Sequence, residues 1–370
     1  MKGTLVASID EAIEKRIGEV RTDAFDITFG ELISLYEAKE FEIRPDFQRF
    51  FRWSMEQRSR LIESVLLELP IPQIFVIESK EGVLELIDGL QRISSIIHFV
   101  QPELLTGIDL RQKLKLIGCD LVQELNGKVF EDLPIALRMR IKRAKVRAVV
   151  IKRQSSKMLR FEMFKRLNTG GSALSEQEIR NCTARMIGEE GAALYEFLTE
   201  CASDQSFANC VSTLSEASKE KRGDEELVLR FFALKNAKDD FKGSVVDWLD
   251  NYMEQVILGS VKFDYKKERK DFSSLFKYLD LVMGDGAFVR YRGQSPIGGL
   301  APAYFEAVSL GTWRVLKKLE SVPPKRVQAT IIQTVQTPAF RANVGSGSNS
   351  LEKFNGRIDA IEDALRELVA

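Results

Sequence analysis

Hydrophobic residues recur at helical spacing along much of the chain, and short apolar runs alternate with these stretches in the first half. The clearest helical pattern starts at Ser54, which has Gln57 at the capping-box position and is followed downstream by Pro70 and Pro72. The apolar residues of this stretch share one face: Leu61, Ile62, Val65, Leu66 and Leu69. The pattern predicts an amphipathic helix that starts at Ser54 and ends before the prolines.

Short β-rich runs bounded by turn residues predict the strands of the first half. Strands are expected at 25–29, 41–43, 73–78, 83–87 and 145–152, and helices at 8–20, 30–40, 91–100 and 156–167. Residues 101–135 show no clear periodicity. Strands that alternate with helices favour an α/β arrangement over a β-sandwich.

From residue 175 onward the pattern is helical almost throughout. Ser175 and Glu178 form a second capping box. Further helices are expected at 189–202, 224–237, 244–258 and 265–283, and a last one with Asn349 as its cap and Glu352 at the third position. The glycine-rich stretch 284–299 is expected to be a long ordered loop or a domain seam.

These two patterns divide the chain, and 370 residues are enough for two domains. We predict an N-terminal helix or arm at 1–24, an α/β (α+β) domain at 25–181 and an all-helical domain at 182–370.

The chain contains a single histidine, His98, beside 54 Lys and Arg and 54 Asp and Glu residues. HNH nucleases, zinc hydrolases and Ser-His-Asp hydrolases each need histidine as a base or ligand, so the composition argues against all three. We expect His98, at the end of an apolar helix, to be a core or boundary residue. Any catalysis would then depend on carboxylates, amides, arginines and backbone donors.

The four cysteines are widely spaced and form no CxxC pair, so neither a zinc knuckle nor a disulfide framework is expected. Neither a signal peptide nor a membrane-spanning run is found. These features favour a cytoplasmic protein with reduced thiols.

Positive charge is concentrated in residues 138–166, which contain twelve Lys or Arg residues and one acid, Glu162. The net charge of +11 in this segment is balanced by −11 elsewhere. Alternation predicts that Lys145 and Arg147 share one face of a strand. Candidate nucleic-acid contacts are Arg140, Lys142, Arg143, Lys145 and Arg147. A basic lining of a nucleotide pocket and a salt-bridged surface are the alternatives.

The sequence Ile-Asp-Gly-Leu-Gln-Arg ending at Arg92 lies where an apolar strand gives way to a helix. Free N–H groups at such a junction attract anions, and Arg92 can fork two hydrogen bonds onto a phosphate. Asp88 can hold Mg²⁺ or orient Arg92, Gly89 lets the backbone approach, and Gln91 can position a water. The alternative is an ordinary turn in which Asp88 caps the helix.

Two further segments carry candidate binding residues. Residues 44–53 interleave arginines with aromatic residues and include Arg44, Gln48 and Arg49. Residues 164–175 can form a nest of backbone donors after a basic helix. The second segment contributes Arg166, Asn168, Thr169, Gly170 and Gly171. The alternatives are a packed aromatic strand for the first and a helix C-cap for the second.

Taken in order, residues 44–53, 70–72, 88–92, 164–171 and 174–181 resemble one family. The segment 25–181 is similar to the N-terminal domain of GmrSD-type restriction enzymes, also classified as domain of unknown function family 262, in the ParB/sulfiredoxin-like superfamily. The signature of this family is Asp-Gly-Gln-Gln-Arg, and in residues 88–92 of this chain Leu90 stands in place of the first Gln.

The resemblance implies a ParB-like domain that binds and hydrolyses a nucleoside triphosphate with Mg²⁺ in anti-phage defence. Asp88, Gln91 and Arg92 are the expected catalytic residues, Arg49 joins Arg92 on the phosphates, and the loop 168–171 closes on the nucleotide. Relatives often carry an HNH nuclease, so DNA and a separate nuclease or defence subunit are the expected partners, and a homo-oligomer is compatible with the sequence. The alternative is a sensor subunit that binds DNA or a partner without turnover.

Overall fold

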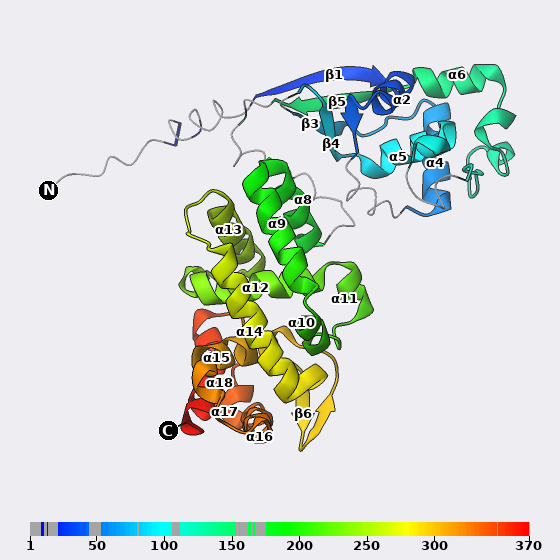
Figure 1. Ribbon diagram of the computed structural model, residues 1–370. Helices are drawn as coiled ribbons and strands as arrows, with labels where there is room; N and C mark the ends of the chain where they lie inside the picture. The colour runs from blue at the N-terminus through cyan, green and yellow to red at the C-terminus, as the bar shows by residue number, and fades with distance from the viewer. Residues whose placement is uncertain are drawn as a thin grey trace. The chain divides into compact units, whose positions relative to one another are not determined.

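The computed structural model describes residues 9–10, 13, 21–43, 53–79, 81–105, 112–152, 155, 162–163, 166, 175–345 and 347–369. The chain forms two compact units, residues 1–172 and 173–370 (Figure 1). The predicted boundary after residue 181 falls inside a helix, α8 (Glu176–Ile187), that packs within the second unit.

The first unit contains a mixed five-stranded sheet in the order β1-β5-β3-β4-β2. The strands are β1 (Thr22–Thr28), β2 (Phe41–Glu42), β3 (Ile74–Glu78), β4 (Leu84–Asp88) and β5 (Lys145–Ile151). β5 pairs antiparallel with β1 and parallel with β3, whereas β4 pairs antiparallel with β3 and parallel with β2. The expected α/β class is therefore confirmed for this unit.

Helices alternate with these strands as the hydrophobic pattern predicts. They are α2 (Phe29–Glu37), α4 (Met55–Leu66), α5 (Leu90–Val100) and α6 (Ile135–Arg143), with short 3-10 turns η1 (Pro102–Leu104), η2 (Gln123–Leu125) and η3 (Phe130–Asp132). The expected capping box of Ser54 and Gln57 is present at the start of α4. Four isoleucines of the sheet and of α5 are completely buried in the core of this unit: Ile74 of β3, and Ile93, Ile96 and Ile97 of α5.

Strand β5 confirms the predicted alternation. Lys145 and Arg147 are exposed, whereas Val146 and Ala148 are each 2% exposed. The basic side chains of β5 therefore lie on the face of the sheet opposite to the one that packs these small apolar residues.

The second unit is almost entirely helical. Its helices are α8, α9 (Glu189–Ala202), α10 (Gln205–Cys210), α11 (Glu216–Glu220), α12 (Gly223–Ala237), α13 (Val245–Ile257), α14 (Tyr265–Met283), α15 (Pro302–Leu319), α16 (Pro324–Thr334), α17 (Pro338–Arg341) and α18 (Leu351–Glu367), with 3-10 turns η4 (Lys238–Asp240) and η5 (Gly284–Gly286). α12 is buried on nearly all sides, and its Phe231 and Phe232 pack against Phe272 of α14. A helix that is apolar all round belongs in a core.

Two predictions for this unit are wrong in detail. The stretch 284–299 is not simply a loop, because β6 (Arg290–Arg292) and β7 (Ser295–Ile297) form a hairpin whose turn uses Gly293 at φ +60°. The cap of α18 is Ser350, which accepts from the Lys353 backbone N–H, rather than Asn349. The first error is a missed two-stranded hairpin and the second a cap displaced by one residue, whereas the expected helices are confirmed.

Two predicted helices lie mostly outside the described residues. Of 8–20, the structure describes Ile9, Asp10 and Ile13 as helical, and of 156–167 it describes Glu162, Met163 and Arg166. Within the described part of the chain, no helix is long and apolar enough to cross a membrane.

Candidate functional site

The turn between β4 and α5 depends on a glycine. Gly89 is the N-cap of α5 and has φ +103°, a conformation that other residues rarely adopt. A Cβ at this position would lie 2.5 Å from Cγ2 of Ile74 in β3. Gly89 is thus required for the backbone geometry and for the packing of the turn on the sheet.

Arg92 is held in the first turn of α5 by two acceptors. Its Nη2 donates to Oδ2 of Asp88 at 2.8 Å and to the carbonyl oxygen of Gln73 at 3.0 Å. The side chains of Arg92 and Asp88 are 18% and 33% exposed. The Nε atom of Arg92 is buried and has no hydrogen-bond partner in the described structure. Two acceptors therefore fix Nη2 of Arg92, whereas its buried Nε–H has no hydrogen-bond partner among the described residues.

The α5 N-terminus carries no side-chain cap among the described residues. The alternative in which Asp88 caps the helix is therefore wrong, because Asp88 accepts from Arg92 instead. Backbone N–H groups of the first turn of a helix have no intrahelical acceptor, and they carry the positive end of the helix dipole. The geometry suits an anion beside Arg92.

Gln91 connects this turn to the start of α4. Its Oε1 accepts from the backbone N–H of Trp53 at 3.1 Å, and the Trp53 carbonyl accepts from Nε of Arg58 at 2.9 Å. The amide oxygen of Gln91 is therefore engaged in positioning the segment that precedes α4. Sequence reasoning did not anticipate this contact, because it joins residues 38 positions apart.

His98 is buried behind the turn at 2% exposure, as expected for a core residue. Its Nε2 lies 2.9 Å from the Gln112 carbonyl oxygen, which can only accept, so Nε2 carries the proton. Nδ1 is then the acceptor for Nη1 of Arg58 at 3.3 Å. Burial lowers the pKa of His98, and the charge of Arg58 lowers it further against the opposing effect of the Gln112 bond. The histidine is neutral and structural.

Neither clustered ligands nor thiols offer another reactive centre among the described residues. No group of three or more His, Cys, Asp or Glu side chains there can hold a metal ion. All four cysteines are buried. Burial raises the pKa of the Cys119 thiol to about 11 and those of Cys201 and Cys210 to about 12, so these thiols stay protonated. A magnesium ion at Asp88 would take its other ligands from phosphate and water.

The basic segment is partly neutralised by its own unit. Arg147 pairs with Asp26 across the β1–β5 ladder at 3.4 Å, and Arg140 lies 3.7 Å from Glu68. Lys142, Arg143 and Lys145 are exposed and form no ion pair with a described residue. Lys142 lies 5.8 Å from the ring centre of Phe130. The unpaired cations occupy the end of α6 and the start of β5.

Several candidate residues cannot be placed. Arg44, Gln48 and Arg49 of the first binding segment lie outside the described residues, as do Asn168, Thr169, Gly170 and Gly171 of the second. Arg166 is described and pairs with Glu162 one turn earlier, with Nε 3.1 Å from Oε2. The geometry at the turn therefore concerns Asp88, Gly89, Gln91 and Arg92.

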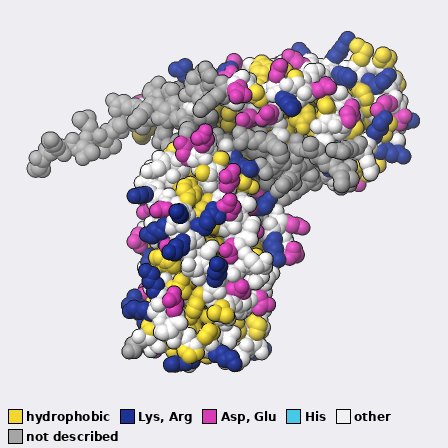
Figure 2. Space-filling model, viewed as in Figure 1, with side chains coloured by type: hydrophobic (Ala, Val, Ile, Leu, Met, Phe, Trp, Pro, Cys, Tyr) yellow, Lys and Arg dark blue, Asp and Glu magenta, His cyan; other side chains and the backbone are white. Residues whose placement is uncertain are grey.

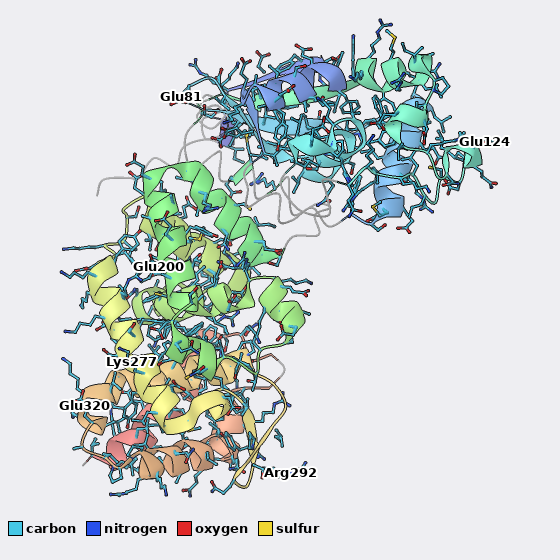
Figure 3. The ribbon with its side chains drawn as sticks, turned by 45° about the vertical axis from the view of Figure 1, so that its right-hand side comes forward. Glu81, Glu124, Glu200, Lys277, Arg292 and Glu320 are labelled. Atoms are coloured by element: carbon cyan, nitrogen blue, oxygen red, sulfur yellow. The ribbon has the colours of Figure 1, made fainter. Side chains whose placement is uncertain are left out.

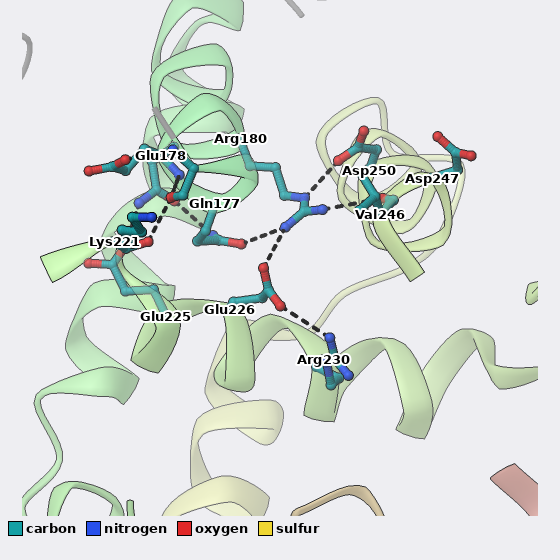
Figure 4. A network of polar contacts seen from close by, with 12 residues as sticks. Gln177, Glu178, Arg180, Lys221, Glu225, Glu226, Arg230, Val246, Asp247 and Asp250 are labelled. Atoms are coloured by element: carbon teal, nitrogen blue, oxygen red, sulfur yellow. Dashed lines mark hydrogen bonds and ion pairs between the residues drawn. The ribbon is translucent and has the colours of Figure 1, made fainter. Parts of the chain in front are cut away.

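The described motif residues, 175–181, have a structural role within the helical unit. Arg180 of α8 is 2% exposed and donates from Nε to Asp250 of α13 at 2.6 Å (Figure 4). Its Nη1 donates to Gln177 at 3.2 Å and to Glu226 of α12 at 3.3 Å. Nη2 donates to the Val246 carbonyl at 3.3 Å. The guanidinium thus satisfies acceptors on three helices.

Buried charges continue beyond Glu226. Arg230 of α12 pairs with Glu226 at 3.1 Å and with Glu306 of α15 at 2.6 Å. Glu306 also accepts from Arg357 of α18, which in turn donates to two backbone carbonyls in the loop before α18. This buried ion chain, of which Glu226 is the one partly exposed member at 30%, consists of three arginines and three acids: Asp250, Arg180, Glu226, Arg230, Glu306 and Arg357. Its charges balance, so it can be buried without a net charge.

Residues 29–184 match a family model described as the GmrSD restriction endonuclease, N-terminal domain. No curated protein matches the chain. The match runs from the start of α2 into α8 and includes both the turn at Asp88 and the motif that contains Arg180. It confirms the resemblance indicated by the motifs, and it relates this segment of the chain to the N-terminal domain of GmrSD-type restriction enzymes.

Proposed function

We propose that the turn at residues 88–92 binds the phosphates of a nucleoside triphosphate together with Mg²⁺, in a restriction-type defence protein. The main support is Arg92, which Asp88 and Gln73 hold in place while its buried Nε lacks a described partner. The uncapped N-terminus of α5 adds backbone donors beside it. The match to the restriction-enzyme domain supports the defence context.

In this proposal the described residues have separate roles at the phosphates. Arg92 binds the terminal phosphates, and a carboxylate such as Asp88 suits Mg²⁺, which favours one or two carboxylates plus phosphate oxygens. The ion would supply neutralisation of the phosphate charge. Arg49 joins Arg92, and Arg44, Gln48, Arg166 and the loop 168–171 enclose the nucleotide. These last assignments rest on the sequence patterns and the resemblance, the ParB-like assignment of the unit rests on the resemblance, and the proposed cytoplasmic location rests on the cysteine pattern of the sequence.

Two observations favour a second candidate function. Leu90 puts an apolar side chain where the signature has Gln, and the Gln91 oxygen already accepts from Trp53. The first removes a polar group from the signature, and the second engages the Gln91 amide in positioning the segment before α4. The second candidate is a sensor that binds nucleotide without turnover and acts through DNA or a partner nuclease.

Titration calorimetry with each of the four nucleoside triphosphates and Mg²⁺, followed by a phosphate-release assay with and without DNA, separates these candidates. The proposal expects binding that is weakened about tenfold or more in Arg92→Ala and is also weakened in Asp88→Asn. Arg60→Ala is the matched control, because Arg60 is an exposed arginine of the same unit that pairs with Asp120. Binding without release favours the sensor, and absence of binding by all four nucleotides contradicts both candidates.

The exposed cations at the end of α6 and the start of β5 form the proposed nucleic-acid contact of this unit. Replacing Lys142, Arg143 and Lys145 by alanine is expected to weaken DNA binding in a salt-dependent way. Arg140 and Arg147 are expected to contribute less, because each already has a carboxylate partner. Unchanged affinity of the triple variant would show that the segment has another use.

A further inference from the structure

Helix α14 of the second unit separates its acidic from its basic side chains. Glu268 and Asp271 both face Lys235 of α12, each with an oxygen 2.6 Å from its Nζ. The Lys235 side chain is 5% exposed and lies 4.8 Å from the ring centre of Trp313. Both carboxylates lie in the N-terminal half of the helix, are directed toward α12 and share the single positive charge of Lys235.

The other acids of this region are also engaged. Asp264 caps the helix by accepting from the Lys267 backbone N–H at 3.1 Å. Asp280, near the other end, accepts from Nδ2 of Asn209 at 3.2 Å. Each of these two carboxylates is thus held in place by a neutral donor and keeps its charge, one at each end of the helix.

The lysines of α14 face outward. Lys266, Lys267, Lys270 and Lys277 are exposed and have no ion pair with any residue that the structure describes. Lys266, Lys270 and Lys277 lie at positions i, i+4 and i+11, so they form one stripe along the helix. With a rise of 1.5 Å per residue the stripe extends about 16.5 Å. Figure 3 shows Lys277 at the outer surface of the unit.

A shallow hollow lies at the N-terminal end of this lysine stripe. It has a volume of about 460 Å³ and is lined by Tyr265, Lys266, Arg269, Lys270 and Ser273. Arg269 is anchored there by an ion pair with Glu200 and by the ring of Phe197, 5.1 Å away. Figure 2 shows Lys and Arg side chains gathered on this part of the second unit.

We propose that the lysine stripe and its hollow bind the phosphate backbone of a nucleic-acid duplex. A straight row of cations on a rigid helix suits a regular array of phosphates, which along one DNA strand are spaced at about 3.4 Å of axis. Lysines contact phosphate as point charges and do not read bases. This surface is separate from the nucleotide turn, and the proposal does not depend on nucleotide binding.

A duplex fits this surface better than a single strand does. Binding of single strands relies on exposed aromatic rings on which bases stack. The aromatic residue of the hollow, Tyr265, packs instead against Phe197 and Phe263 at centroid distances of 5.3 and 5.0 Å. The surface therefore offers charge without a stacking platform.

The test measures fluorescence anisotropy of the full chain with a short DNA duplex, an RNA duplex of the same sequence and a single strand, over a series of salt concentrations. The stripe variant is Lys266→Ala, Lys270→Ala and Lys277→Ala. The control variant is Lys242→Ala, Lys317→Ala and Lys325→Ala, which removes three exposed lysines of the same unit. A Lys→Arg variant of the stripe keeps the charge.

The stripe variant is expected to bind a duplex about tenfold or more weakly at low salt, and its log–log salt slope is expected to fall by about 2–3. The control and the Lys→Arg variants should behave like wild type. Dependence on the stripe for either duplex supports the proposal, and comparing DNA with RNA tells which is preferred. Equal losses in the stripe and control variants, or a stripe effect confined to single strands, would overturn it. Loss of nucleotide binding in Arg92→Ala leaves this result unaffected.

Discussion

Two arginines of the matched family segment, Arg92 and Arg180, contrast in how their charge is used. Arg92 is 18% exposed, pairs with one acid and keeps a buried Nε without a described partner. Arg180 is 2% exposed and donates to two acids, a glutamine and a carbonyl. The first has one acidic partner and an Nε that is unpaired among the described residues, a feature that Arg230 and Arg357 share, whereas the second is held by four hydrogen bonds within the protein.

This difference shows that a family motif can combine residues with unlike purposes. A buried charge with every donor satisfied stabilises one arrangement of helices and has little left to offer a ligand. An arginine fixed on one side and open on the other is prepared for an anion. Replacing each residue should therefore give opposite results for stability and for binding, and the predictions below follow in order of expected size.

The largest effect on stability is expected from Arg180→Met. The substitution leaves Asp250 and Gln177 buried without their donor, and breaking a buried pair typically costs about 3–5 kcal/mol. Chemical denaturation of the full chain measures the change, with the exposed Arg60→Ala as control. A loss below about 1 kcal/mol would show that the buried ion chain is not a structural anchor.

Gly89→Ala is expected to come next, at about 2–3 kcal/mol, because it combines backbone strain with a clash against Ile74. Gly82→Ala is a matched control, since Gly82 has φ +84° but nothing lies within 4 Å of its Cβ position. The control should cost about 1 kcal/mol from strain alone. Equal costs at the two glycines would mean that packing on β3 is unimportant.

His98 is expected to make stability depend on pH. Its pKa is lowered in the folded state, so below the unfolded pKa of about 6.5 the unfolded chain takes up a proton that the folded protein does not. This contribution to stability is full above that pH and falls as pH decreases, by up to about 1.4 kcal/mol per pH unit. In His98→Asn the slope between about pH 6.5 and 5.5 should be shallower. An unchanged slope would assign the dependence to other groups.

Arg92→Ala should have the smallest effect on stability, below about 1 kcal/mol, because its ion pair with Asp88 is partly exposed and screened by solvent. Denaturation beside Arg180→Met makes the comparison direct. A loss similar to that of Arg180→Met would mean that both arginines are structural.

Local features of the fold were predictable from the sequence, and long-range ones were not. The capping boxes at Ser54 and Ser175 and the alternation at Lys145 depend on neighbours within a few residues. The Asp88–Arg92 pair lies within one helical turn and was anticipated as one of two roles for Asp88.

The buried ion chain shows the limit of such reasoning. Arg180 and Asp250 are 70 residues apart, and Glu306 and Arg357 are 51 apart, so only the packing of the helices brings them together. The lysine stripe of α14 could not be predicted either. In the sequence its lysines alternate with the acids Glu268 and Asp271, and only the fold shows that both acids pair with Lys235 of α12.

The central claim is that Arg92 is kept for a phosphate ligand, and calorimetric titration of wild type, Arg92→Ala and Arg60→Ala with the tightest-binding nucleoside triphosphate in Mg²⁺ tests it most directly. The loss of charge-assisted hydrogen bonds worth about 1.5–3 kcal/mol predicts that the Kd of Arg92→Ala rises by about 10- to 150-fold, whereas the Kd of Arg60→Ala stays unchanged. Equal affinities of all three proteins would contradict the claim.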